Sequence, residues 1–155
     1  VIVPPYGSWV FLGTILTDHP APPPDRAPSP PCIRCGKCQK VCPGGALRGE
    51  TFDPERCLSH LTQKKGELPP EQEALLAAHP LAWGCDLCQR VCPYNAHPKA
   101  TELSTFRDDL VDNLTEDMVE GVTNRQFKER YGDRAFAWRG PAVIRRNLAL
   151  QTSKN

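Results

Sequence analysis

The sequence lacks a long hydrophobic run and a clear excess of charge of either sign. Its longest apolar stretch, Trp9 to Leu16, is interrupted by Gly13 and Thr14 and is far shorter than the roughly 20 residues that span a bilayer. No basic leader precedes it, so it is not read as a signal peptide. A net charge of +1 implies no general attraction to nucleic acid. We therefore expect no membrane association and, with 155 residues, about one domain.

Cysteine, in contrast, follows a specific pattern. The eight cysteines form two runs and one isolated residue, namely Cys32-x2-Cys35-x2-Cys38-x3-Cys42-Pro43, Cys85-x2-Cys88-x3-Cys92-Pro93 and Cys57 between them. The spacing of the first run is the bacterial signature for [4Fe–4S] clusters. Eight thiolates suffice for two clusters of four ligands each. The sequence therefore predicts an electron carrier.

The ligands of each cluster follow from an exchange between the runs. In two-cluster ferredoxins the fourth cysteine of a run binds the other cluster. The first cluster is then expected to be held by Cys32, Cys35, Cys38 and Cys92. The second is expected to be held by Cys42, Cys57, Cys85 and Cys88. Cys57 enters this second set because it is the only cysteine left, and a long excursion from Ser59 to Gly84 separates it from its run.

Two other uses of cysteine fit the pattern less well. Pairs at two-residue spacing often bind zinc, but three cysteines within seven residues followed by a fourth and a proline suit zinc poorly. A disulfide framework would also use an even number, yet such scaffolds are small and secreted. A cluster pattern points instead to a reducing cytoplasm, and we expect a monomer there.

The expected fold class is α+β but mostly helical, with a bacterial ferredoxin-like double [4Fe–4S] module and a helical C-terminal extension. We divide the chain into an N-terminal remnant of an upstream catalytic domain (1–19), a proline-rich linker or loop (20–31), the two-cluster module (32–100) and a helical C-terminal segment (101–155). The chain starts at Val1 rather than methionine, so we interpret it as part of a longer protein.

Local signals place the elements. Residues 10–16 are apolar enough for a buried strand or short helix. Short helices are expected at 36–41 and 86–91, and another at 69–79. Asp53 followed by Pro54 is typical of a helix start, predicting a helix to about Gln63 that carries Cys57. Thr115 and Thr123 are predicted caps of short helices, and 141–150 is the predicted final helix.

Five segments of the chain resemble epoxyqueuosine reductase, a cobalamin-dependent family of bacterial queuosine-tRNA biosynthesis. The segments are GSWVFLGTILTD (7–18), CIRCGKCQKVCPGGAL (32–47), DPERCLSHLT (53–62), GCDLCQRVCPYN (84–95) and FAWRGPAVIRRNLAL (136–150). They occur in the family's order and cover most of the chain. The isolated cysteine before the shortened second run is itself a trait of the family.

The resemblance implies an oxidoreductase that reduces the epoxide of epoxyqueuosine to the alkene of queuosine at the wobble position of tRNA. In the family, cobalamin lies between an N-terminal catalytic domain and the cluster-bearing part, and the clusters supply it with electrons from a donor that the sequence does not identify. The catalytic acid of the family would lie upstream of Val1. We therefore expect no catalytic residue in this chain.

Some residues acquire candidate roles through the resemblance. Gly7, Ser8 and Trp9 match a segment near the cofactor, and Tyr94 and Asn95 follow the last ligand; for all five, core packing is the alternative. Three arginines, Arg139, Arg145 and Arg146, are candidates for tRNA contact. The neighbouring Trp138 is expected in the core rather than on an RNA base.

Two other functions remain open. One is a cobalamin-dependent reductase of the reductive-dehalogenase type, which has similar twin clusters. The other is a ferredoxin-like carrier without catalysis, against which the segments GSWVFLG and FAWRG (7–13 and 136–140) argue, because a simple carrier does not need them.

Overall fold

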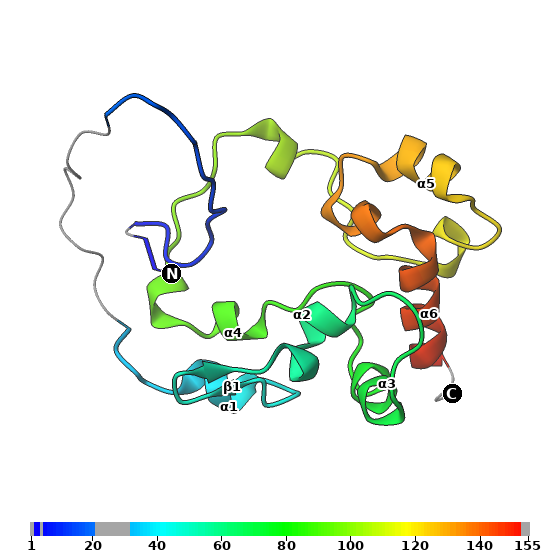
Figure 1. Cartoon of the computed structure of the whole chain (residues 1–155), viewed down its shortest axis with the longest axis horizontal. Coiled ribbons are helices and arrows are strands. Elements are labelled where there is room, and N and C mark those ends of the chain that lie inside the picture. Colours follow the sequence, from blue (N-terminus) through cyan, green and yellow to red (C-terminus); the bar gives the residue numbers. More distant parts are fainter. Residues whose placement is uncertain (1, 4, 21–31, 153–155) are drawn as a thin grey trace.

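The computed structural model describes residues 2–3, 5–20 and 32–152 (Figure 1). The predicted proline-rich linker, apart from Pro20, lies outside the described residues. The N-terminal residues lie near the chain that follows α4, and the C-terminal helix α6 lies at the opposite end of the molecule (Figure 1). The chain therefore places its N-terminal segment beside the end of the second cysteine run.

Short helices dominate the described residues, as the predicted fold class requires. The α-helices are α1 (Lys37–Val41), α2 (Leu58–Leu61), α3 (Pro70–Ala77), α4 (Leu87–Arg90), α5 (Asn124–Tyr131) and α6 (Pro141–Thr152). The 3-10 helices are η1 (Pro54–Arg56), η2 (Pro93–Asn95), η3 (Ser104–Phe106), η4 (Glu116–Met118) and η5 (Ala135–Arg139). The strands β1 (Leu47–Arg48) and β2 (Thr51–Phe52) form an antiparallel pair with Leu47 opposite Phe52. The mostly helical α+β class is confirmed.

Several helix starts follow the local signals in the sequence. The Asp53 side chain accepts a hydrogen bond from the Glu55 N–H at the start of η1 (3.0 Å). Thr123 and Gln126 form a reciprocal capping box at α5, which satisfies amides that a helix leaves without partners. Pro141 begins α6, where its missing N–H is not needed.

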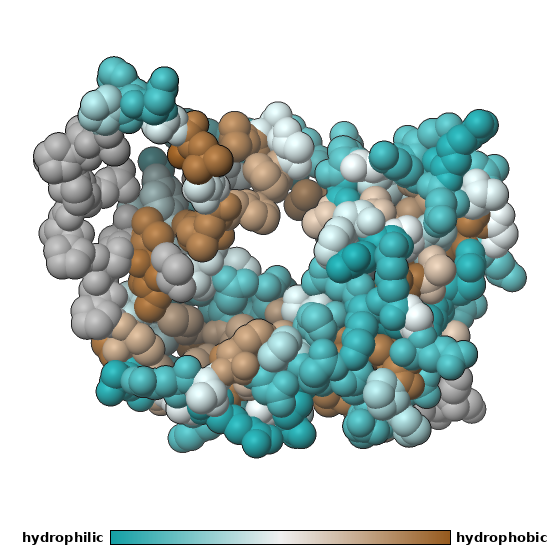
Figure 2. All heavy atoms as spheres, in the orientation of Figure 1, coloured by the Kyte–Doolittle hydropathy of each residue, from teal (hydrophilic) through white to brown (hydrophobic). Residues whose placement is uncertain are grey.

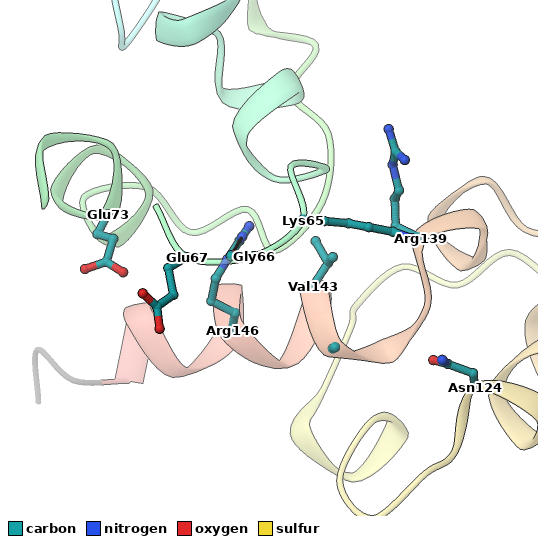
Figure 3. Close-up of a pocket in the computed structure, with 9 residues that line it drawn as sticks. Lys65, Gly66, Glu67, Glu73, Asn124, Arg139, Val143 and Arg146 are labelled. Atoms are coloured by element: carbon teal, nitrogen blue, oxygen red, sulfur yellow. Dashed lines mark hydrogen bonds between the residues drawn. The ribbon is translucent and has the colours of Figure 1, made fainter. Parts of the chain in front are cut away.

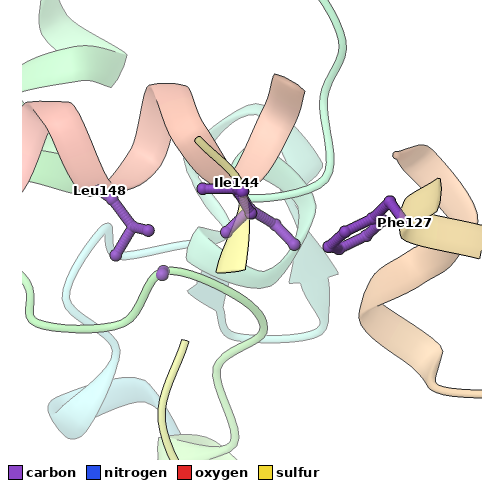
Figure 4. Packing of buried hydrophobic residues seen from close by; sticks show 5 residues of the cluster. Phe127, Ile144 and Leu148 are labelled. Carbon is purple, nitrogen blue, oxygen red and sulfur yellow. The ribbon is translucent and has the colours of Figure 1, made fainter. Parts of the chain in front are cut away.

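Two hydrophobic clusters hold the structure together. One consists of Ala82, Val119, Phe127, Ile144 and Leu148, and Figure 4 shows Ile144 and Leu148 on α6 with Phe127 approaching from α5. The other consists of Leu58, Leu61, Leu68 and Leu76, with Cys85 and Leu150 packed against it. Residues of α6 belong to both clusters, so α6 connects the C-terminal segment to the elements around Cys57 and Cys85.

Four local predictions are wrong. The segment 10–16 is neither strand nor helix, and Phe11 and Leu16 are 91% and 95% exposed. The helix expected from Asp53 to Gln63 is broken at Cys57, whose backbone is extended between η1 and α2. Thr115 precedes η4, but its side chain makes no capping hydrogen bond. Trp138 is 61% exposed rather than in the core.

Among the described residues, no helix combines the length and the apolar character that crossing a membrane requires.

Candidate iron–sulfur site

The two cysteine runs meet because the short helices inside them pack together. Cys38 lies in α1 and Cys88 in α4, and these two helices are in contact. Each run then ends in an extended cysteine, Cys42 or Cys92, followed by a proline. Each of these prolines has a fixed φ and lacks an N–H, and Pro93 begins η2. The backbone thus leaves the helical conformation at the last cysteine of each run.

A close backbone contact brings the end of the first run to Cys57. The Arg56 guanidinium donates through Nε to the Gly44 carbonyl (2.6 Å). A Cβ on Gly44 would lie 1.8 Å from the Arg56 carbonyl oxygen, so only glycine permits this approach. Gly44 is two residues after Cys42, and Arg56 directly precedes Cys57. The contact therefore places these two cysteines in the same region.

The thiols assigned to the second cluster interact electrostatically. Burial is the main cause that raises the pKa of Cys85, the N–H of Leu87 lowers it, and the charges of Cys57, Asp86 and Cys42 raise it further. Burial also raises the pKa of Cys88, with Cys85, Cys57 and Cys42 adding to the effect and the N–H of Gln89 opposing it. Cys57 and Cys42 therefore contribute to the rise in the pKa of both thiols. A cation that binds them would reverse it, because coordinated thiols lose their protons.

The first predicted cluster lies at a more exposed position. Cys32 and Cys35 are exposed and Cys38 and Cys92 are partly buried. A backbone amide already faces one of its sulfurs, since Arg34 donates to Cys32 (3.4 Å), and at the second predicted cluster Ala46 donates likewise to Cys42 (3.2 Å). Such amides tune cluster potentials. All eight thiols are free, so the donor set fits two clusters.

The zinc alternative depends on how closely the ligands converge. Within the described part of the chain, no three His, Cys, Asp or Glu side chains converge so as to hold one ion. A cubane cluster needs its thiolates around a larger object than a zinc ion does. The preference for clusters over zinc therefore continues to rest on the cysteine spacing.

Four of the five residues proposed near the cofactor form one junction. The Ser8 N–H donates to Asn95 Oδ1 (2.7 Å), and Asn95 Nδ2 donates to Ser8 Oγ (2.7 Å) and to the Gln89 carbonyl (2.8 Å). A Cβ on Gly7 would lie 2.0 Å from Asn95 Oδ1 and 2.6 Å from the Tyr94 carbonyl oxygen. The junction docks the N-terminal segment onto the end of the second cysteine run. Asn95 is buried, which agrees with the alternative that these residues serve core packing.

Trp9, the fifth, lines an open apolar groove beside this junction. The groove has a volume of about 700 Å³ and is lined by Ser8, Trp9, Val10, Phe11, Asp86, Gln89, Thr101, Leu103 and Phe106. The rings of Phe11 and Phe106 stack with centroids 5.9 Å apart. Figure 2 shows hydrophobic residues gathered around the opening on the side of the N-terminal segment. A large, flat and partly apolar cofactor would fit such a surface.

The three arginines proposed to contact tRNA have different surroundings. Arg139 stacks on the exposed Trp138 ring, with its Cζ 3.7 Å from the ring centroid. Arg145 is exposed and donates to the Val119 carbonyl. Figure 3 shows Arg146 rising from α6 toward the Gly66 backbone, whereas Arg139 points away from α6.

Arg146 is engaged inside the protein. Its guanidinium donates to the carbonyls of Lys64 (2.7 Å), Gly66 (2.7 Å) and Leu61 (3.1 Å), and twice to the Asn147 side chain. Burial lowers the pKa of Arg146, although Glu73 opposes this. Five donors in use leave little capacity for a phosphate, so these contacts favour a structural role.

Sequence reasoning missed Thr62 and Asn147, two fully buried polar residues near the cysteines. The Asn147 Nδ2 donates to the carbonyls of Thr62 and Ala82 (2.8 Å each). A signal was present, because Asn147 interrupts the apolar face formed by Val143, Ile144 and Leu148 on α6. A buried amide on such a face requires hydrogen-bond partners.

Comparisons with known proteins agree with this geometry. Residues 31–95 match the family described as a 4Fe-4S double cluster binding domain. Epoxyqueuosine reductase of Listeria monocytogenes is 41% identical over 153 residues, which cover 97% of this chain and 39% of the relative. The chain thus spans about two fifths of the length of this curated relative.

Solved structures give the same result. A crystal structure of selenomethionine-labelled epoxyqueuosine reductase superimposes with a TM-score of 0.71 at 34% identity, covering 84% of this chain and 35% of that one. A second, of epoxyqueuosine reductase with a tRNA-Tyr epoxyqueuosine-modified tRNA stem loop, gives a TM-score of 0.61 at 31% identity, covering 84% and 35%. The similarity therefore includes the fold and not only the cysteine spacing.

Proposed function

Since the chain belongs to the epoxyqueuosine reductase family and corresponds to its C-terminal iron–sulfur part, we propose that it delivers electrons for the reduction of epoxyqueuosine to queuosine in tRNA. One observation carries this proposal: all eight cysteines lie within the region that matches a double-cluster domain. The assignment of each cysteine to a cluster and the domain boundaries given above remain part of the proposal, as does a location in the cytoplasm.

The chemistry requires a source of single electrons. Conversion of an epoxide to an alkene consumes two electrons and two protons and releases the oxygen as water. Iron–sulfur clusters held by thiolates transfer electrons singly. Packing of α1 against α4 holds the two runs in contact, so electrons can pass between the clusters. The residues of this chain serve by fixing the clusters, and we assign them no proton transfer.

We further propose that cobalamin binds along the groove beside Trp9. Its walls are rich in exposed apolar side chains, among them Phe11 and Phe106. Gln89 and Asp86 of the second cysteine run also line it, which connects the groove to the second cluster. When bound, cobalamin supplies a cobalt centre that accepts single electrons. The junction of Ser8 with Asn95 would hold the groove's wall against the cluster module.

For tRNA contact, the geometry favours Arg139 over Arg146. Arg139 shares an open depression with His60, Lys64, Lys65 and Trp138, which offers positive charge and an exposed aromatic ring. Unpaired RNA bases stack on such rings, and cations contact the phosphates. Arg145 is exposed and stays in the proposal as a phosphate contact.

The reaction can be tested by nucleoside analysis of tRNA from a strain without the gene. We expect epoxyqueuosine to accumulate and queuosine to disappear, and the wild-type gene to restore queuosine. Normal queuosine with no epoxide would contradict the proposal.

The RNA surface is tested separately by the salt dependence of tRNA binding. Arg139→Ala should reduce the slope of log K against log salt by about 0.7–0.9 for each phosphate that the arginine neutralises. Arg125→Ala is the matched control, because Arg125 is exposed on α5 and pairs with Glu129. An unchanged slope for Arg139→Ala would remove this residue from the surface.

A further inference from the structure

The second cysteine run lacks its first cysteine at a defined position. A run with the spacing of the first would carry a cysteine three residues before Cys85, which is position 82. That position holds Ala82, which is buried in the hydrophobic cluster with Phe127 and Ile144. Cys57 can replace the missing ligand only if the intervening excursion begins and ends at nearly the same place.

One side chain joins the two ends of this excursion by hydrogen bonds. Asn147 is 1% exposed, and its Nδ2 donates to the carbonyls of both Thr62 and Ala82, at 2.8 Å each. These two residues lie near the two ends of the excursion, because Thr62 follows α2 and Ala82 leads into the second run. The Asn147 Oδ1 accepts from Arg146 (2.8 and 3.1 Å), which fixes the orientation of the amide. Both the oxygen and the nitrogen of the Asn147 amide therefore have hydrogen-bond partners.

Thr62 adds a direct bridge between the two ligand segments. Its Oγ1 accepts the Gly84 N–H at 3.0 Å, immediately before Cys85. The same hydroxyl donates to the Ser59 carbonyl at 3.0 Å, two residues after Cys57. Thr62 is itself fully buried, so water does not compete for these bonds. The backbone that leaves Cys57 and the backbone that enters Cys85 are thus joined through one hydroxyl.

From these contacts we infer that Asn147 and Thr62 are positioning residues that hold Cys57 within reach of the second cluster. This inference rests on the proposed assignment of Cys57 as a ligand. In a compact run, the short sequence spacing keeps the ligands close together. Here the Asn147 amide and the Thr62 hydroxyl keep Cys57 close to the second run instead. The helix α6 thereby controls the second cluster from outside the cysteine module, and the first cluster does not depend on it.

The test is the rate at which a chelator removes iron from the complete, anaerobically reconstituted chain. Signals of the second cluster are identified as those absent from Cys57→Ala. Loss of one buried hydrogen bond should speed release about tenfold. Thr62→Val loses the bonds to Gly84 and Ser59, and Asn147→Ala loses those to Thr62 and Ala82. We therefore expect each variant to release the second cluster about a hundredfold faster, with the first cluster unchanged.

Two variants serve as controls. Thr62→Ser keeps the hydroxyl and should restore the wild-type rate. Gln151 lies one turn beyond Asn147 on α6 and donates to the His79 carbonyl (3.2 Å), which belongs to neither of the residues that Asn147 joins. Gln151→Ala should thus leave both clusters unchanged, although it too removes a bond between α6 and the excursion.

The outcomes separate the inference from the proposal beneath it. A wild-type chain that binds about four iron atoms instead of about eight would refute the two-cluster assignment itself. With two clusters present, wild-type rates in Asn147→Ala and Thr62→Val would refute the positioning role alone. Equal acceleration of both clusters would also refute it, because general destabilisation would then explain the result. If Asn147→Ala does not fold, the comparison of Thr62→Val with Thr62→Ser decides.

Discussion

Replacement of Gly7 by alanine tests whether the N-terminal segment docks as the structure shows. Gly7 has φ of +65°, which costs an alanine roughly 1 kcal/mol. The added Cβ would also lie 2.0 Å from Asn95 Oδ1. Asn95 cannot easily turn aside, because its Nδ2 already binds Ser8 and the Gln89 carbonyl. The segment therefore has to leave Asn95 to accept the methyl group.

The expected size follows from the bonds that undocking would break. These are the two hydrogen bonds between Ser8 and Asn95 and the one that Ser8 Oγ donates to Gln89 Oε1 (3.0 Å), each worth about 1 kcal/mol. With the backbone strain, the docked state should be destabilised by about 4 kcal/mol, which is roughly a thousandfold in the docking equilibrium. Hydrogen–deuterium exchange of a peptide covering residues 6–12 measures this as faster exchange of the Ser8 amide.

Two glycines provide matched controls for this substitution. Gly121 has the same φ of +65°, but a Cβ there meets nothing within 4 Å, so Gly121→Ala reports the backbone strain alone. Gly13 lies in the same segment with open space around it, and Gly13→Ala should change nothing. Wild-type exchange of the Ser8 amide in Gly7→Ala would refute the docking, and with it the groove that Trp9 lines.

Three further predictions address the clusters, the core and α6. Cys57→Ala should remove the second cluster and Cys32→Ala the first, read by electron paramagnetic resonance of each variant; equal loss from both would contradict the exchange of ligands between the runs. Phe127→Ala should lower the free energy of unfolding by about 3–5 kcal/mol, because Phe127 is 0% exposed, and denaturant titration would measure this. Arg146→Ala should destabilise the chain without flattening the salt dependence of tRNA binding, whereas Arg145→Ala should flatten it; the reverse pattern would exchange their roles.

Local rules predicted those parts of the fold in which neighbours along the chain decide the structure. The predicted cap at Thr123 depends only on residues of the first turn, and the structure completes it with Gln126 at the start of α5. Pro141 likewise marked the start of α6. The cysteine spacing identified the cluster module because the ligand geometry is set within each short run. These signals do not depend on contacts between distant segments.

Apolar character alone misplaced Phe11 and Trp138. Hydrophobic side chains are usually buried, but a large part of any protein surface is still apolar. The run at 10–16 was expected to be buried because it is apolar, yet Val10 and Phe11 line an open groove and Ile15 and Leu16 are exposed. Trp138 donates through its indole to Gln63 (3.2 Å) while its ring stays exposed beside Arg139. Composition indicates what a side chain prefers and not what the fold places against it.

The break at Cys57 shows how a distant contact overrides a local preference. Asp53 and Pro54 start a helical turn as predicted, and a continuous helix would be the local continuation. Instead the Arg56 carbonyl lies against Gly44, and the Arg56 side chain donates to the Gly44 carbonyl. These contacts fix the backbone just before Cys57 in relation to the end of the first run. An extended Cys57 then lets the chain satisfy that contact and still begin α2, whose far end Thr62 and Asn147 attach to the second run. The isolated cysteine is thus held from both sides by residues that no cysteine pattern includes.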